Sequence, residues 1–226
     1  MMDYTHTLLF GFYPYLAGTV FLLGSLLRFD HGQYTWKTGS SQMLTKRRMR
    51  VGSNLFHIGI IVIFFGHLVG LLTPHWAYEW AITPGNKQIM AIVVGGIAGV
   101  LCLTGGMILL YRRLFDPRVR ASSSTADIVI LALLMVQVTL GLFTIIAAVD
   151  HLDGGVMLPL AEWAQSIVFF RAGAASHLMD VGLIYKLHIF VGLTIVLIFP
   201  FTRLVHAWSA PFGYIGRRYQ LVRQRA

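Results

Sequence analysis

Four of the nine histidines lie inside long apolar stretches, where an ionisable side chain is costly and is therefore a candidate for function. His57 and His67 share one stretch, and His188 and His206 share another. Two imidazoles on facing helices are the axial ligands that a six-coordinate haem iron needs. A single buried histidine more often hydrogen-bonds to a neighbouring helix. Four of them on only two helices favour a pair of haem sites.

The composition predicts that these stretches cross a membrane. Hydrophobic residues make up 56% of the 226 residues and charged residues 12%, against about 25% charged residues in a soluble domain. A bilayer crossing needs roughly 20 mainly apolar residues, and five segments qualify: about Leu8 to Leu27, Val51 to Leu72, Gln88 to Leu110, Ile128 to Val149 and Val181 to Trp208. We therefore predict an all-α membrane protein, a bundle of five transmembrane helices in one domain over residues 1–226, with a basic tail at about 209–226.

Basic residues gather on one side of the predicted bundle. Of the 18 lysines and arginines, six lie in or beside the first linker, four in or beside the third, and five toward the C-terminus; only Lys87, Arg171 and Lys186 fall on the other side. Because cytoplasmic loops carry such an excess, we place the C-terminus in the cytoplasm and the N-terminus outside. The same short clusters between apolar runs explain the net charge of +9 without a nucleic-acid site.

This topology pairs the four histidines. The second helix runs outward and the fifth runs inward, so His57 is level with His206 near the cytoplasm and His67 with His188 nearer the outside. The spacings disagree, however. His57 and His67 are 10 residues apart, about 15 Å on a helix, whereas His188 and His206 are 18 apart, about 27 Å. We expect a kink at Pro200, or a tilted helix or haem, to reconcile the two distances.

The residues around the histidines favour two haem b groups over other cofactors. Cys102 is the only cysteine and there is no C-x-x-C-H sequence, so covalent attachment of haem is excluded. Two histidine ligands leave no open position on an iron, which favours electron transfer over oxygen chemistry. A zinc site is disfavoured because carboxylates and cysteines are absent from the two histidine-bearing helices.

Cations near the helix ends have two interpretations, because each either pairs with a haem propionate or extends to the lipid headgroups. Those at the expected haem levels are Arg112, Arg113 and Arg203 toward the cytoplasm and Lys186 toward the outside. Lys87 opens the third helix on the outer side, near the level of His67. We predict that Lys87 donates to a quinone carbonyl or orients a quinol hydroxyl; the alternative is an interfacial anchor.

Glycines beside the histidines also have two interpretations. Gly59 and Gly66 flank the histidines of the second helix, and further glycines line the third. A glycine lets a flat macrocycle approach the backbone, but it equally lets two membrane helices pack tightly. The sequence does not choose between them.

Several distinctive stretches resemble one known family. They extend over nearly the whole chain and include Tyr13-Pro14-Tyr15, Gly32-Gln33-Tyr34-Thr35-Trp36, Ser40-Ser41-Gln42-Met43-Leu44, Asn54-Leu55-Phe56-His57-Ile58-Gly59, Gly66-His67, Leu72-Thr73-Pro74-His75-Trp76, Arg112-Arg113-Leu114-Phe115, Pro117-Arg118-Val119-Arg120 and Tyr219-Gln220-Leu221-Val222-Arg223. In this combination the chain resembles the gamma subunit of bacterial respiratory nitrate reductase, the membrane cytochrome b of that complex.

The resemblance implies a function in detail. It implies the same four haem ligands in the same pairing, and a site for quinol (menaquinol or ubiquinol) near the His67/His188 haem, with Lys87 at the matching position. It also implies a place in the bacterial cytoplasmic (inner) membrane. Electrons would pass from quinol through the outer and inner haems to an iron–sulfur beta subunit and a molybdenum-containing alpha subunit, which reduces nitrate in the cytoplasm. Protons would leave outward.

Three alternatives remain open at this point. The first is a gamma-like cytochrome that serves another reductase complex. The second is a transporter whose intramembrane histidines relay protons, although Asp127 and Asp180 only border the starts of two spans and none of the five spans contains a carboxylate. The third is a membrane anchor in which the four histidines have no common purpose.

Overall fold

The computed structural model describes the chain except residues 1–3, 37–43, 45–47, 210–215 and 217–226, and all regular elements of the described part are helices. Five of its helical segments are long and apolar enough to cross a membrane, which confirms the predicted fold class. They are Tyr4–His31 (α1, Tyr4–Thr7; η1, Leu8–Phe12; α2, Tyr13–His31), Met49–Leu72 (α3), Pro84–Phe115 (α5), Thr125–Ala148 (α7) and Leu183–Phe201 (α9, Leu183–Ile198; η5, Phe199–Phe201).

Shorter helices connect the long ones. They are η2 (Gln33–Thr35), α4 (His75–Tyr78), α6 (Pro117–Ala121), η3 (Val149–His151), α8 (Met157–Val168), η4 (Ala174–Leu178) and η6 (Arg203–Ser209). The predicted basic tail at about 209–226 lies outside the described residues, apart from Ser209 and Gly216.

The starts of two spanning helices are encoded locally. Pro84 opens α5, where its missing N–H costs nothing, and the Thr83 hydroxyl accepts a hydrogen bond from the Asn86 N–H at 3.3 Å. Ser124 and Asp127 form a reciprocal capping box at the start of α7. Both caps satisfy N–H groups that a helix start leaves without intrahelical partners.

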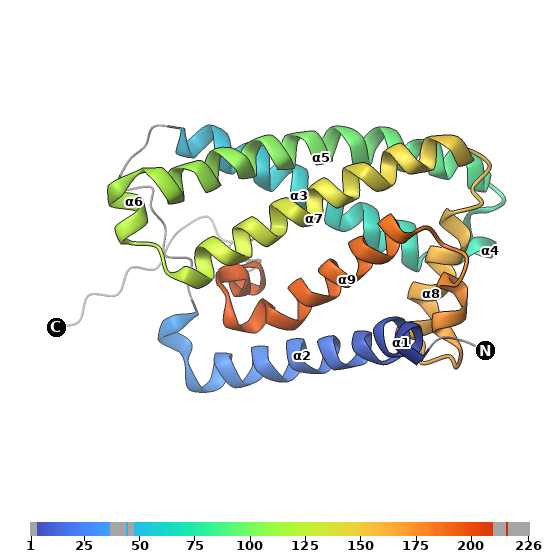
Figure 1. Ribbon diagram of the computed structural model, residues 1–226, viewed down its shortest axis with the longest axis horizontal. Coiled ribbons are helices and arrows are strands. Elements are labelled where there is room, and N and C mark those ends of the chain that lie inside the picture. Colours follow the sequence, from blue (N-terminus) through green and yellow to red (C-terminus); the bar gives the residue numbers. More distant parts are fainter. Residues whose placement is uncertain (1–3, 37–43, 45–47, 210–215, 217–226) are drawn as a thin grey trace.

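The long helices follow one another in space in the order α3, α5, α7, α9 and α2 (Figure 1). Each packs closely against the next, whereas α3 does not pack closely against α9 in the described part of the chain. Helix α3, which carries His57 and His67, is thus separated by two others within the series from α9, which carries His188. Any approach of His67 to His188 must be made by their side chains.

The most extensive of these contacts, between α3 and α5, depends on glycine. A Cβ on Gly59 would lie 2.5 Å from the carbonyl oxygen of Ala98, and one on Gly105 would collide with the backbone N of Phe56. For Gly59 the helix-packing interpretation is therefore right. Gly66 differs, because a Cβ there would meet nothing within 4 Å.

Helix α8 closes the end of the bundle near the N-terminus (Figure 1). Its Trp163 is buried in an apolar cluster with Phe10 and Leu178, and the indole N–H donates to the Phe10 carbonyl at 2.9 Å. Gln165 donates to the carbonyl of Leu71 at 3.0 Å, at the end of α3. These bonds tie the first two spanning segments to the long connection before α9.

The fifth span is shorter than predicted. We expected one helix through to Trp208, but α9 ends at Ile198, η5 covers Phe199–Phe201, and Thr202 is extended before η6 begins at Arg203. Pro200 cannot donate to a helical ladder. The guanidinium of Arg28 then holds the turn, donating to the carbonyls of Pro200 at 2.6 Å and Thr202 at 2.8 Å.

Candidate functional site

The structure brings together the two histidine pairs that the topology predicted. The ring centroids of His67 and His188 are 6.0 Å apart, and those of His57 and His206 are 6.3 Å apart. Imidazole nitrogens bind transition metals at about 2 Å, so two rings on opposite sides of one metal have centroids about 6 Å apart. Both pairs therefore have the separation that a metal between them requires.

The early end of α9 resolves the disagreement in spacing. His206 lies in η6, outside the spanning helix, so the prediction that it belongs to a continuous fifth helix is wrong. The chain turns at Thr202 instead of adding the helical rise expected between Ile198 and His206. As a result both pairs face each other, although the two spacings along the sequence differ.

Three of the four imidazoles are oriented by their own backbone. In each, Nδ1 donates to a carbonyl three or four residues earlier: His57 to Ser53 at 2.7 Å, His67 to Ile63 at 2.8 Å and His206 to Arg203 at 2.6 Å. A proton on Nδ1 leaves the lone pair on Nε2 free, as a metal ligand needs. Burial, and then the neighbouring His57, lower the pKa of His206, which favours the neutral imidazole that a metal ligand needs.

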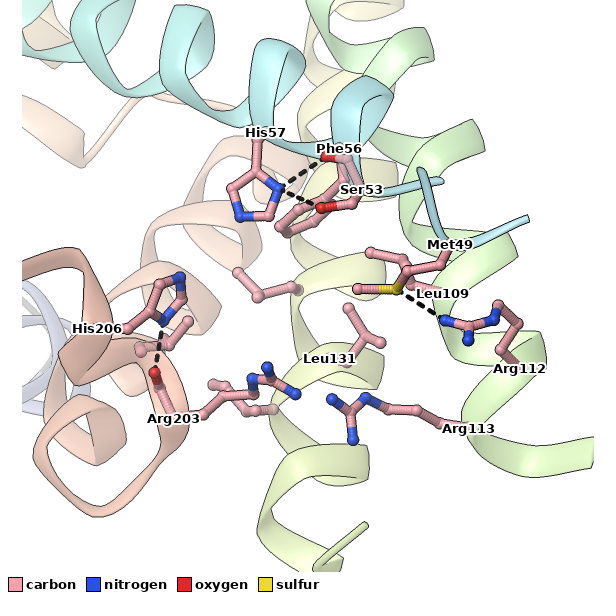
Figure 2. A pocket seen from close by; sticks show the side chains of 13 residues that line it. Met49, Ser53, Phe56, His57, Leu109, Arg112, Arg113, Leu131, Arg203 and His206 are labelled. Atoms are coloured by element: carbon pink, nitrogen blue, oxygen red, sulfur yellow. Dashed lines mark hydrogen bonds between the residues drawn. The ribbon is translucent and has the colours of Figure 1, made fainter. Parts of the chain in front are cut away.

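A cavity lies beside the His57/His206 pair (Figure 2). Its volume is about 100 Å³. Its lining combines apolar side chains with Arg112, Arg113 and Arg203. Such a surface suits a flat apolar group that carries carboxylates.

The carboxylate of Asp127 lies close to two of the arginines that line this cavity. Asp127 lies 3.8 Å from the nearest nitrogen of Arg113 and 3.9 Å from that of Arg203, and Arg113 also donates to the Ser123 hydroxyl at 2.8 Å. Two cations and one carboxylate leave this cluster with a net positive charge. Lys186, the cation predicted at the outer level, instead donates to the Met179 carbonyl at 2.9 Å.

Lys87 is buried at the opposite end of the bundle. Its side chain is 6% exposed, and Nζ has no hydrogen-bond partner among the described residues. The ring of Tyr78, on α4, covers it with the centroid 3.7 Å from Nζ. A lipid anchor extends its amine into water, so this burial disfavours the anchor interpretation and leaves a donor available to a ligand.

Other described histidines have partners of their own away from the two pairs. His6 bonds to the Ala175 carbonyl at 2.8 Å, His75 pairs with Glu79 at 2.8 Å, and His177 with Glu162 at 3.2 Å. Sequence reasoning missed two residues that contact the site, Gln137 beside His188 and Arg28 at the turn before His206. The available signal for Gln137 was a lone side-chain amide within an apolar run.

The chain is similar to known proteins along nearly its whole length. The family model described as nitrate reductase gamma subunit matches residues 6–225. The chain belongs to the nitrate reductase gamma subunit family. It is 56% identical over 225 residues to the respiratory nitrate reductase 2 gamma chain of Escherichia coli (strain K12), with both chains covered completely. Two further relatives are the respiratory nitrate reductase 1 gamma chain of the same strain, 54% identical over 99% of this chain and 100% of the relative, and the nitrate reductase gamma chain of Bacillus subtilis (strain 168), 37% identical over 97% and 98%.

As a nitrate reductase gamma chain, the protein is a membrane subunit of an oxidoreductase complex. This confirms the family resemblance noted from the sequence motifs. The ligand roles of the four histidines and the role of Lys87 stay predictions, which the geometry above is compatible with.

Proposed function

We propose that this gamma chain holds two haem b groups, oxidises quinol at its outer face and delivers the electrons to partner subunits in the cytoplasm. The observation that carries the proposal is the presence of two histidine pairs, each at the separation of axial ligands and each at a different depth. His57 and His206 would hold the inner haem iron, and His67 and His188 the outer one.

The surroundings of both pairs fit haem. The cationic cavity beside His57 and His206 matches the propionates of an inner haem, with Arg113 and Arg203 as the nearest candidates to bind them. Beside His67, the open space at Gly66 would accept the edge of a macrocycle. A haem iron with two imidazole ligands supplies one-electron transfer and offers no open coordination position.

Lys87 is the proposed contact for quinol. Its buried, unpartnered Nζ can donate a hydrogen bond to a quinol or quinone oxygen, and Tyr78 limits the access of water to it. Lys87 is the fourth residue of α5 and His67 lies five residues before the end of α3, so both are within about two helical turns of the same end of the bundle. Oxidation of one quinol releases two electrons and two protons at this end.

The charge distribution supports an orientation. Most of the basic residues that the structure describes lie at the end that carries Arg113 and Arg203, so this end faces the cytoplasm, the N-terminus lies outside, and the chain is a multi-pass protein of the bacterial inner membrane. Electrons then move inward to an iron–sulfur beta subunit and a molybdenum-containing alpha subunit, while protons leave outward. This separation of charge contributes to the proton-motive force.

The test is the haem b content of the purified complex and of four histidine variants. We expect two haems per gamma chain in the parent protein, loss of the outer haem alone in His67→Ala and His188→Ala, and loss of the inner haem alone in His57→Ala and His206→Ala. His75→Ala is the matched control, because this histidine lies outside both pairs, and it should keep both haems.

Two results would refute the proposal. A folded but colourless parent protein would favour the proton-relay transporter, and equal loss of both haems from all four variants would leave the pairing unsupported. Partner subunits of another kind in the purified complex would instead favour a cytochrome that serves a different reductase.

A further inference from the structure

One histidine of the outer pair is oriented differently from the other three. His188 makes no hydrogen bond to its own backbone; its Nε2 lies 3.3 Å from the side-chain Nε2 of Gln137, on α7. Both side chains have a buried polar atom left over, because His188 Nδ1 and Gln137 Oε1 have no hydrogen-bond partner in the described part of the chain. Buried groups of this kind are costly to leave unpaired.

Two glycines make this contact tight. A Cβ on Gly141, one turn after Gln137, would lie 3.0 Å from Cε1 of His188. A Cβ on Gly192, one turn after His188, would lie 3.0 Å from Nε2 of Gln137. Each polar side chain therefore lies against a glycine of the facing helix, and this reciprocal packing holds the amide beside the imidazole.

We infer that Gln137 is the positioning residue for His188, with its amide oxygen accepting the imidazole N–H that does not bind the metal. A neutral imidazole has one N–H and one lone pair. A half-turn of the amide exchanges its oxygen and nitrogen, and it then offers an acceptor to the ring at the same 3.3 Å. In contrast to the other three histidines, the lone pair is then left on Nδ1 of His188, which has no hydrogen-bond partner among the described residues and would bind the metal. The inference rests on the proposed haem-binding function.

Because the hydrogen-bond partner of His188 is a side chain, a substitution of Gln137 can change it. The other three imidazoles donate to main-chain carbonyls, which no side-chain substitution removes. An acceptor on a ligand imidazole increases its basicity, and a more basic ligand stabilises the oxidised iron. The residue at position 137 should therefore set the reduction potential of the outer haem and leave the inner one unchanged.

Substitutions of Gln137 that differ in hydrogen bonding should shift this potential in opposite directions. Gln137→Met keeps the length of the side chain but removes the acceptor, so the outer potential should rise. Gln137→Glu offers a stronger acceptor, so the potential should fall. We expect about a tenfold change in the redox equilibrium for each variant, which is about 59 mV for a one-electron couple. The measurement is an optical redox titration of the purified complex, with the outer haem identified as the one missing from His67→Ala.

Gln165→Met is the matched control. This glutamine also uses its amide near the outer end, donating to the Leu71 carbonyl at 3.0 Å, and the bond involves no histidine. It should leave both potentials unchanged. Loss of the outer haem from Gln137→Met but not from Gln137→Glu would also support the inference.

The inference is overturned if Met and Glu at position 137 shift the outer potential in the same direction, leave it unchanged, or move the inner potential equally. Loss of the outer haem from both variants would likewise overturn it, because hydrogen bonding would not then separate them. A parent protein without haem would instead refute the proposed function itself.

Discussion

Arg28 provides a direct test of how the inner histidine pair is assembled. Its guanidinium donates to the carbonyls of Pro200 at 2.6 Å and Thr202 at 2.8 Å, and a second nitrogen donates to the Thr35 carbonyl at 2.9 Å. The first two bonds fix the turn that ends the fifth span and begins the segment carrying His206. Arg28→Leu removes these three bonds, together with the longer bond from Nε to the Thr35 hydroxyl at 3.4 Å, and keeps an apolar side chain.

The expected magnitude follows from the two bonds to the turn. A hydrogen bond to a charged group contributes about 1.5–3 kcal/mol net, and the lower value applies because Arg28 is half-buried and water can reach the freed carbonyls. Two such bonds amount to about 3 kcal/mol. At about 1.4 kcal/mol per tenfold change, the affinity of the inner site for haem falls by up to about a hundredfold.

The assay is the rate of haem transfer from the purified complex to an excess of an apo-haem protein of high affinity. We would measure it in a His67→Ala background, where only the inner site is expected to be filled. Arg28→Leu should accelerate the transfer strongly, and Arg28→Lys should fall between the two because it keeps the charge but loses the planar fork. The matching experiment in a His57→Ala background should show no change. An unchanged rate, or equal acceleration in both backgrounds, would show that Arg28 does not position His206.

Two further predictions concern α3 and α5. Gly59→Val should lower the temperature of thermal unfolding, because its Cβ would lie 2.5 Å from the Ala98 carbonyl oxygen. Gly66→Val should unfold at the parent temperature, because a Cβ at Gly66 meets nothing within 4 Å. It should nevertheless lose the outer haem if the macrocycle occupies that space. Lys87→Met should leave stability equal or higher, since it removes a buried amine that has no hydrogen-bond partner among the described residues. Quinol-dependent nitrate reduction should fall at normal haem content; undiminished turnover would exclude Lys87 from the quinol site.

Sequence alone was sufficient for the architecture and for the pairing of the histidines. Apolar runs of spanning length can only be helices in lipid, since every backbone polar group must be satisfied within the segment. The five spans follow from this rule, and their alternating direction places His57 with His206 and His67 with His188. The same reasoning could not locate the end of the fifth helix, because Pro200 is compatible with either a kink or a stop.

Tertiary structure decided the details that position each side chain. Arg28 is separated from Pro200 by 172 residues and Gln137 from His188 by 51, so no local pattern reveals that they touch. The ambiguity of the glycines was likewise resolved only in space, where Gly59 faces a neighbouring backbone and Gly66 faces none. Local sequence encodes helices and caps because their hydrogen bonds span a few residues; the surroundings of a ligand depend on which helix faces lie together, and only the packed bundle determines that.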